Sequence, residues 1–334
     1  MTEFAWVVDH PAPADDGPLR RVERALPDPG PGQVRVRVSA CGVCRTDLHL
    51  AEGDLPPKGP GVVPGHEIVG VVQAHGPGAE RFAVGQRVGV PWLGGTDGRC
   101  RFCRSGRENL CLAPTFTGWD VDGGYADACL ADEAFAYALP PGLDDEPAAP
   151  LLCAGIIGYR ALRSANLPPG GRLGLYGFGG SAHLAAQIAL HEGARVHVLT
   201  RGAANQALAR ELGVDSVGGA SDAPPEKLDS AVLFAPVGDL VPVALEALDR
   251  GGTLAVAGIY LSDIPPLRYD DDLFQERVLR SVTANTRADG EEFLRLAERF
   301  GLHATTHGYP MSEAPKALSD LKHGRFAGAA VLHN

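Results

Sequence analysis

The fold of this 334-residue chain is decided by the stretch Arg172-Leu173-Gly174-Leu175-Tyr176-Gly177-Phe178-Gly179-Gly180-Ser181-Ala182. Its first five residues form a short apolar run typical of a strand, and a helical pattern follows from Ala182 to Leu190. Glycines between a strand and a helix permit a tight turn and let a pyrophosphate approach the helix N-terminus. We therefore predict a dinucleotide site at Gly177, Gly179 and Gly180.

The sequence that follows this loop repeats the same alternation of strand and helix. Short apolar runs occur at 195–199, 230–234 and 253–257, and a helical pattern spans 205–212. Strands that alternate with helices indicate βαβ units and a parallel sheet. This half of the chain is therefore predicted to be an α/β, doubly wound domain of the Rossmann type.

The first 150 residues have a different pattern. Residues 33–38 alternate polar and apolar side chains, and the runs 67–72 and 87–90 are β-rich and bounded by Gly and Pro. These features predict an antiparallel, barrel-like β domain. After about residue 285, two helical patterns at 291–300 and 312–323 and a final strand at 328–332 are expected to return to this domain.

Charge and composition exclude several classes of protein. The net charge of −11 is not offset by any basic cluster, which argues against binding to nucleic acid or to an anionic membrane surface. No apolar run approaches the roughly 20 residues that cross a bilayer, and the opening MTEFAWVVDH lacks the pattern of a signal peptide. We expect a cytoplasmic protein whose seven cysteines do not form a disulfide framework.

The end of the second predicted strand bears on the choice of nicotinamide cofactor. An acidic residue there would bind the ribose 2′-hydroxyl of NAD, but the sequence reads Leu199-Thr200-Arg201-Gly202. Thr200 leaves room for a 2′-phosphate and Arg201 can pair with one. The pattern favours NADP without excluding NAD; the alternative is that Arg201 is only a solvated loop residue.

Three separated residues have side chains suited to a metal. Cys44 precedes Arg45-Thr46-Asp47-Leu48-His49, His66 lies in Gly65-His66-Glu67, and Cys153 lies in Pro150-Leu151-Leu152-Cys153-Ala154-Gly155. Any one of them alone would usually be structural. Together with the Cys cluster near residue 100 and the nucleotide loop, in this order, they resemble the zinc-dependent medium-chain alcohol dehydrogenases along essentially the whole chain.

This resemblance implies a catalytic zinc held by Cys44, His66 and Cys153, with the fourth position left for water or the substrate oxygen. Glu67 matches a carboxylate that can approach the metal during ligand exchange. Asp47 matches the carboxylate that orients the His ligand. Cys41 is not a ligand by this resemblance, although it forms a Cys-x-x-Cys pair with Cys44.

The same resemblance assigns roles to three neighbours of Cys44. Thr46 and His49 match a proton relay from hydroxyl to imidazole, and a histidine can complete such a relay because it titrates near neutral pH. Arg45 matches a residue that contacts the cofactor pyrophosphate.

A second zinc is implied near residues 94–113. The family's structural-zinc lobe has four Cys, whereas this chain reads Asp97-x2-Cys100-x2-Cys103-x7-Cys111. Carboxylate oxygen is an acceptable zinc ligand, so a site of one oxygen and three sulfurs is feasible. The alternative is a lobe without a structural metal, in which the three cysteines stay reduced or bind metal only weakly.

The substrate pocket is expected to be lined by Leu55, Trp92 and Trp119, together with Thr46. Leu55 replaces a bulky Trp found in relatives restricted to small alcohols, so the pocket is expected to accept medium-length or aromatic alcohols. The alternative is that these residues only pack between domains.

The resemblance implies a GroES-like catalytic domain over 1–153 and 286–334 and a Rossmann cofactor domain over 154–285. We predict a zinc-dependent alcohol dehydrogenase (EC 1.1.1.-) that transfers hydride reversibly between primary or secondary alcohols and NAD(P). Each subunit is expected to hold two zinc ions, and the subunits are expected to form a homotetramer or a homodimer. Two alternatives stay open: a zinc-free quinone or enone reductase of the same superfamily, and a non-catalytic binding protein with this fold.

Overall fold

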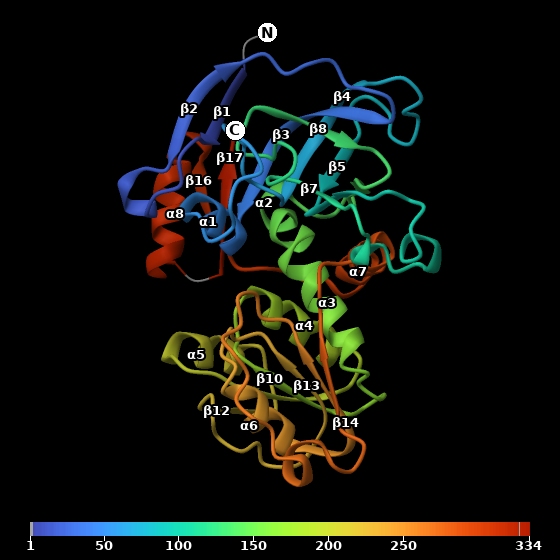
Figure 1. The fold of residues 1–334 in the computed structure, drawn as a ribbon, viewed down its shortest axis with the longest axis vertical. Coiled ribbons are helices and arrows are strands. Elements are labelled where there is room, and N and C mark those ends of the chain that lie inside the picture. Colours follow the sequence, from blue (N-terminus) through green and yellow to red (C-terminus); the bar gives the residue numbers. More distant parts are fainter. Residues whose placement is uncertain (1–2, 327) are drawn as a thin grey trace. The chain divides into compact units, whose positions relative to one another are not determined.

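The computed structural model describes residues 3–326 and 328–334, and the chain folds into two compact units (Figure 1). The first unit contains the described residues of Met1–Cys153, Ala284–Glu298 and His303–Asn334. The second unit contains Ala154–Thr283 and Arg299–Leu302. Within the described residues, no helix combines the length and the apolar character needed to span a bilayer.

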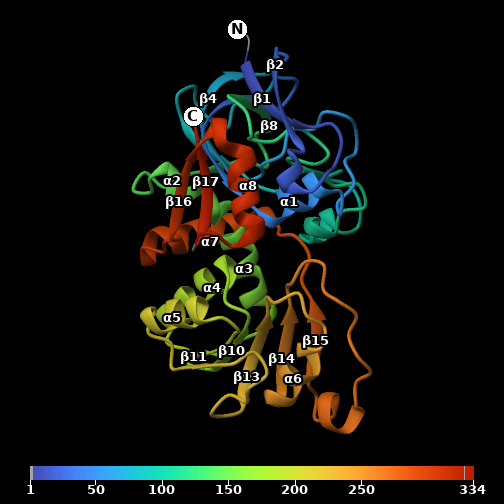
Figure 2. The same ribbon diagram turned by 90° about the vertical axis from the view of Figure 1, so that its left-hand side faces the viewer.

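A parallel sheet forms the centre of the second unit, and its strands β13, β14 and β15 are seen side by side in Figure 2. In spatial order the strands are β12 (Ser216–Gly218), β11 (Arg195–Leu199), β10 (Arg172–Tyr176), β13 (Leu228–Leu233), β14 (Leu248–Val256) and β15 (Val278–Ser281). The helices are α3 (Ala154–Ser164), α4 (Gly180–His191), α5 (Ala203–Glu211) and α6 (Leu240–Ala247), with a π-helical turn at Tyr269–Leu273. The predicted doubly wound parallel sheet is confirmed.

Helices cover this sheet on both faces, which explains why its strands read as continuous apolar runs. Tyr176 on β10 belongs to one buried cluster with Leu240 and Leu245 of α6. Leu173 and Leu175, which alternate with Tyr176 along the strand, point to the opposite face of the sheet and are also fully buried. Both faces of β10 are therefore part of the core of the second unit.

A mainly antiparallel sheet built on the long strand β3 (Gln33–Val43) forms the centre of the first unit (Figure 1), and within it β16 (Thr306–Pro310) and β17 (Ala329–His333) pair in parallel. The C-terminal strand β17 pairs antiparallel with β3, so the end of the chain belongs to this unit. The other members are β4 (Ile68–His75), β5 (Arg87–Val90), β8 (Ala128–Asp132), β9 (Tyr137–Ala138), β16 (Thr306–Pro310) and β17 (Ala329–His333).

Smaller elements surround this sheet and complete the first unit. Two further strand pairs are β1 (Glu3–Val8) with β2 (Leu19–Arg24), and β6 (Leu93–Gly95) with β7 (Thr115–Phe116). The helices are α1 (Arg45–Glu52), α2 (Asp145–Ala148), α7 (Arg287–Phe300), whose last two residues fall in the second unit, and α8 (Ala314–His323). Short 3-10 turns lie at Ala14–Asp16, Cys103–Ser105, Glu108–Leu110, Ala149–Leu152 and Met311–Glu313.

Candidate active site

The first helix positions the residues that follow Cys44. Strand β3 ends at Val43, and Cys44 has an extended backbone and serves as the N-cap of α1. Asp47, at the third position of the helix, accepts a hydrogen bond through Oδ2 from the backbone N–H of Cys44 at 2.8 Å. This is the reciprocal half of a capping box, and a carboxylate in the first turn also suits the helix dipole.

The second oxygen of Asp47 orients the predicted histidine ligand. Oδ1 of Asp47 accepts the backbone N–H of Gly65 at 3.1 Å and lies 3.1 Å from Nδ1 of His66. A carboxylate can only accept, so Nδ1 of His66 carries the proton and Nε2 is turned toward the cluster. Both side chains are buried, which keeps this pair away from competing water.

Four side chains converge as a metal site requires. The Sγ atoms of Cys44 and Cys153, a ring nitrogen of His66 and a carboxylate oxygen of Glu67 all lie within 4.8 Å of one another. Nε2 of His66 is buried and has no hydrogen-bond partner among the described residues. An unsatisfied buried nitrogen beside two thiols is the donor set that zinc binds, so these residues fit the metal.

The protonation states of Cys44, Cys153 and Glu67 depend on their burial and on the short distances between them. A hydrogen bond with Cys153 lowers the pKa of Cys44 well below its ordinary value, and the same contact, with burial, raises the pKa of Cys153. Burial, reinforced by the Cys44 thiolate, raises the pKa of Glu67. Zinc binds thiolates, so its binding would release a proton from Cys153, the thiol whose pKa is raised.

Cys41 does not join this cluster. It lies within β3, its side chain is fully buried, and its Sγ packs where a Cβ on Gly65 or Gly124 would stand. The structure therefore places the two residues of the Cys-x-x-Cys pair in different environments, and Cys44 alone reaches the metal-type cluster.

The predicted relay residues lie on one side of α1. Oγ1 of Thr46 is 3.9 Å from Sγ of Cys44, and His49 follows three residues later, on the same helix face. Nδ1 of His49 lies 2.9 Å from Oδ2 of Asp54, a partner that the sequence analysis missed. Arg45, at the helix start, is exposed.

Aromatic rings adjoin the cluster. Trp92 meets His66 edge-on, with ring centroids 4.9 Å apart, and stacks on Phe116 at 4.8 Å and on Trp119 at 6.1 Å. Phe116 was missed in the sequence analysis, because nothing in its local sequence separates it from a core residue. The backbone N–H of Leu55 donates to the carbonyl of His49 at 3.0 Å, which holds Leu55 close to α1.

The second group of predicted ligands is also assembled. Ligand atoms of Asp97, Cys100, Cys103 and Cys111 lie within 4.8 Å of one another. Oδ1 of Asp97 accepts the N–H groups of Cys100 and Arg99, both at 2.9 Å, and these bonds lower the pKa of the Asp97 carboxyl. The Sγ of Cys111 accepts N–H groups from Asp97 and Ala113, as a thiolate ligand does.

An ion pair that the sequence analysis missed anchors this lobe. Glu108 accepts three hydrogen bonds from Arg287 at the start of α7: from its backbone N–H at 2.8 Å, from Nε at 2.9 Å and from Nη2 at 2.6 Å. The guanidinium also lies over the ring of Phe135. The partners are 179 residues apart in sequence, so no local pattern could have paired them.

The nucleotide loop lies in the second unit, between β10 and α4. Gly177 has φ +88, and a Cβ there would lie 2.8 Å from the backbone nitrogen of Ala235, so only glycine fits. Gly179 is the N-cap of α4 and Gly180 its first residue. The backbone amides at this helix start are therefore placed to receive a phosphate group.

The residues predicted to bind the ribose end of the cofactor follow β11, the strand that pairs with β10. Thr200 directly follows β11, is buried, and its backbone N–H donates to the carbonyl of Gly218 at 3.0 Å. Arg201 is exposed beside it. Because β11 is parallel to β10, Thr200 and the glycine loop lie at the same edge of the sheet.

Comparison with known proteins identifies the family. A profile described as "Alcohol dehydrogenase GroES-like domain" matches residues 30–141, and one described as "Zinc-binding dehydrogenase" matches residues 180–299. A "Probable alcohol dehydrogenase AdhA" from Mycobacterium tuberculosis is 57% identical over 336 residues, covering 99% of this chain and 97% of that protein. This chain belongs to the zinc-type medium-chain dehydrogenase/reductase family.

Solved structures agree with this assignment. A cobalt- and zinc-bound thermostable alcohol dehydrogenase from Pyrobaculum aerophilum matches with a TM-score of 0.89 and 25% identity, covering 100% of both chains. An acetophenone reductase from Geotrichum candidum in complex with NAD matches with a TM-score of 0.88 and 27% identity, covering 100% of this chain and 97% of that one. The predicted fold class, family and alcohol dehydrogenase function are confirmed.

Proposed function

We propose that this alcohol dehydrogenase holds a catalytic zinc through Cys44, His66 and Cys153 and transfers hydride reversibly between primary or secondary alcohols and NAD(P). The observation that carries the proposal is the convergence of two partly buried thiols on the buried Nε2 of His66, which has no hydrogen-bond partner among the described residues. When bound, the zinc acts as a Lewis acid that favours loss of the alcohol proton or polarises a carbonyl.

The chain's own residues prepare this chemistry. Asp47 keeps the proton of His66 on Nδ1, so that Nε2 presents its lone pair. Glu67, buried beside the ligands, can approach the metal during ligand exchange. Thr46 and His49 carry the proton released by alcohol oxidation toward solvent, and Asp54 at Nδ1 of His49 directs that proton to Nε2.

The proposed cofactor binds at Gly177, Gly179 and Gly180, with Arg45 on its pyrophosphate and with NADP preferred. The preference rests on Thr200 and Arg201, which place a hydroxyl and a cation where an NAD enzyme commonly has a carboxylate. The acetophenone reductase solved in complex with NAD supports the binding of a nicotinamide cofactor. Arg201→Ala should raise the KM for NADP but not for NAD, whereas the exposed Arg210→Ala should change neither.

We also propose that Asp97, Cys100, Cys103 and Cys111 hold a second, structural zinc. The N–H groups that bond to Asp97 and Cys111 support this assignment, because backbone N–H groups that donate to ligand atoms hold those atoms in place. The thiols at both clusters must stay reduced to bind metal, which supports a cytoplasmic location.

The proposed substrate pocket is bounded by Leu55, Trp92 and Trp119. The stacked indoles beside His66 offer flat apolar surface to an aromatic or medium-length alcohol. Leu55→Trp should lower activity on aromatic alcohols more than on ethanol, and equal loss on both would contradict this pocket.

The proposal also includes the assembly and the limits of the domains. We take the catalytic domain as 1–153 and 286–334, with the structural-zinc lobe near 94–113, and the cofactor domain as 154–285. The enzyme is proposed to be a homotetramer or homodimer, which sedimentation analysis would decide.

Metal analysis tests the central proposal. Wild-type protein should contain about two zinc ions per chain, and Cys44→Ser and Cys100→Ser should each lose about one. Activity should disappear with the zinc that depends on Cys44. Full activity on quinones or enones after complete zinc removal would favour the zinc-free reductase, and zinc binding without turnover of any alcohol would favour a binding protein.

A further inference from the structure

Tyr125 is a fully buried tyrosine whose hydroxyl reaches the same carboxylate as the predicted metal ligands. Its side chain is 0% exposed, and its hydroxyl donates to Oδ2 of Asp47 at 3.3 Å. Its backbone is fixed as well, because its N–H donates to the carbonyl of Pro64 at 3.0 Å and its carbonyl accepts the N–H of Trp6 at 2.8 Å.

Within the described part of the chain, the Asp47 carboxylate receives hydrogen bonds from four donors. Cys44 and Tyr125 donate to Oδ2, and Gly65 and His66 donate to Oδ1. Three of these donors belong to the two segments that carry the ligands Cys44 and His66. Tyr125 is the donor from elsewhere in the chain, 78 residues after Asp47.

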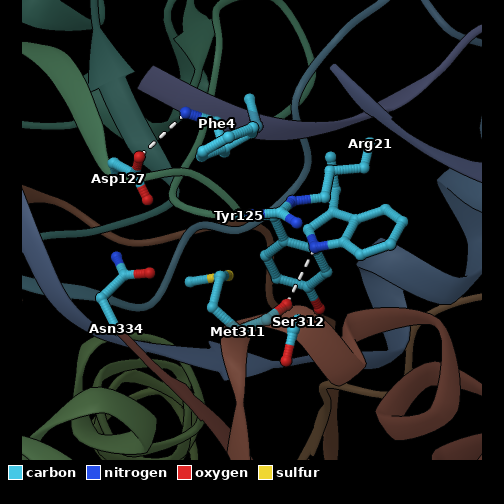
Figure 3. A pocket seen from close by; sticks show the side chains of 9 residues that line it. Phe4, Arg21, Tyr125, Asp127, Met311, Ser312 and Asn334 are labelled. Carbon is cyan, nitrogen blue, oxygen red and sulfur yellow. Dashed lines mark hydrogen bonds between the residues drawn. The ribbon is translucent and has the colours of Figure 1, made fainter. Parts of the chain in front are cut away.

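The ring of Tyr125 has little room to move. A Cβ on Gly65 would lie 2.5 Å from Cδ1 of Tyr125, so the ring packs directly against the residue before His66. Tyr125 also lines a small surface hollow with Met311 and Ser312 (Figure 3). Trp6 lines the same hollow, and its indole Nε1 donates to the carbonyl of Met311 at 2.8 Å. The hydroxyl is thus presented to Asp47 from a fixed position.

We propose that Tyr125 is a positioning residue for the catalytic zinc: its hydroxyl fixes the rotation of the Asp47 carboxylate, which in turn fixes the ring of His66 and the N-cap conformation of Cys44. This inference rests on the proposed catalytic zinc. Substitution of a residue that orients metal ligands through hydrogen bonds commonly changes metal affinity by about 10–100-fold. A neutral donor at 3.3 Å belongs at the lower end of that range.

The test compares Tyr125→Phe with Tyr309→Phe. Tyr309 is the matched control, because it is also buried in the first unit and donates to a carboxylate, that of Asp320, at 3.0 Å. Zinc release from the holoenzyme to an excess of a chelator that changes colour on binding zinc is followed over time. The kinetic phase of release that is absent from Cys44→Ser is assigned to the cluster of Cys44, His66 and Cys153. We expect Tyr125→Phe to speed that phase by about tenfold and Tyr309→Phe to leave it unchanged.

Two further measurements separate positioning from packing. The visible absorption of the cobalt-substituted enzyme should shift in Tyr125→Phe and not in Tyr309→Phe, because only the first changes the ligand geometry. In an Asp47→Asn background, Tyr125→Phe should no longer speed zinc release, because its effect passes through that carboxylate.

The remaining outcomes would contradict either the positioning role of Tyr125 or the proposed catalytic zinc. Equal zinc release in the two phenylalanine variants, or failure of Tyr125→Phe alone to fold in excess zinc, would contradict the positioning role. An unchanged effect of Tyr125→Phe in the Asp47→Asn background would also contradict it. A wild-type enzyme with no release phase that depends on Cys44 would instead contradict the proposed catalytic zinc.

Discussion

Gly42→Ala tests whether close packing against β3 holds Glu67 in the metal cluster. Gly42 does not have the positive φ that disfavours other residues, so alanine can adopt its backbone conformation. The added Cβ would overlap Oε2 of Glu67 and would lie 2.8 Å from its Cδ. The cost of the substitution therefore falls on the side chain of Glu67.

The magnitude follows from these distances. Carbon atoms in ordinary contact are about 3.5 Å apart, so the carboxyl carbon of Glu67 must retreat by roughly 0.7 Å. Glu67 is buried, and forced overpacking of this kind costs about 1–3 kcal/mol of unfolding free energy. Because misplacement of about 1 Å near reacting groups can cost about 100-fold in rate, we expect a loss of that order in kcat/KM.

Denaturant unfolding and steady-state kinetics measure the two effects. Gly142→Ala is the matched control, since a Cβ there meets nothing within 4 Å, and its unfolding free energy should change by less than about 0.5 kcal/mol. In a Glu67→Gly background, which removes the Oε2, Cδ and Cβ atoms that the added Cβ would meet, Gly42→Ala should lose most of its cost. Additive effects of the two substitutions would refute the reasoning.

Three other predictions concern contacts that do not involve Glu67. Glu108→Gln should lower the unfolding free energy at pH 7 by about 1.5–3 kcal/mol. Burial tends to raise the pKa of Glu108, but the hydrogen bonds from Arg287 outweigh it and hold that pKa below 4.5. Denaturant titrations should therefore show the stability difference above pH 4.5 and its loss as the pH falls through the folded-state pKa of Glu108. Phe116→Ala should raise the KM for benzyl alcohol but not for ethanol in steady-state assays, because it removes the ring stacked on Trp92. Gly177→Ala should weaken cofactor binding in fluorescence titrations, because its Cβ would lie 2.8 Å from the backbone of Ala235; unchanged binding would contradict the tight turn.

The parts of the fold that were predicted from the sequence are those with a strong local signal. The strands at 172–176 and 195–199 have the bounds that the sequence predicts, because both are buried apolar runs that end in a turn. The edge strands β12 and β15 were missed. The first has only three residues, and the second, Val278–Ser281, lies in a polar, largely exposed segment whose sequence does not read as a strand.

The site shows the same division between local and long-range information. The glycine loop is a local pattern, and the ligand set Cys44, His66 and Cys153 came from family resemblance rather than from spacing. Phe116 and Tyr125 act through partners that only the folded chain brings near, so no periodicity could have identified them.

The chemistry of Asp47 explains why one residue serves both the fold and the site. All four of its partners present donors, two N–H groups to Oδ1 and an N–H and an O–H to Oδ2. An asparagine would turn its NH2 group toward one of these donor pairs and leave it without an acceptor. A glutamate has an extra methylene and could not cap α1 and reach His66 with the same geometry. Only an aspartate carboxylate can therefore begin the helix at Cys44 and orient His66 at the same time, which ties the start of α1 to the metal ligands on both sides of it.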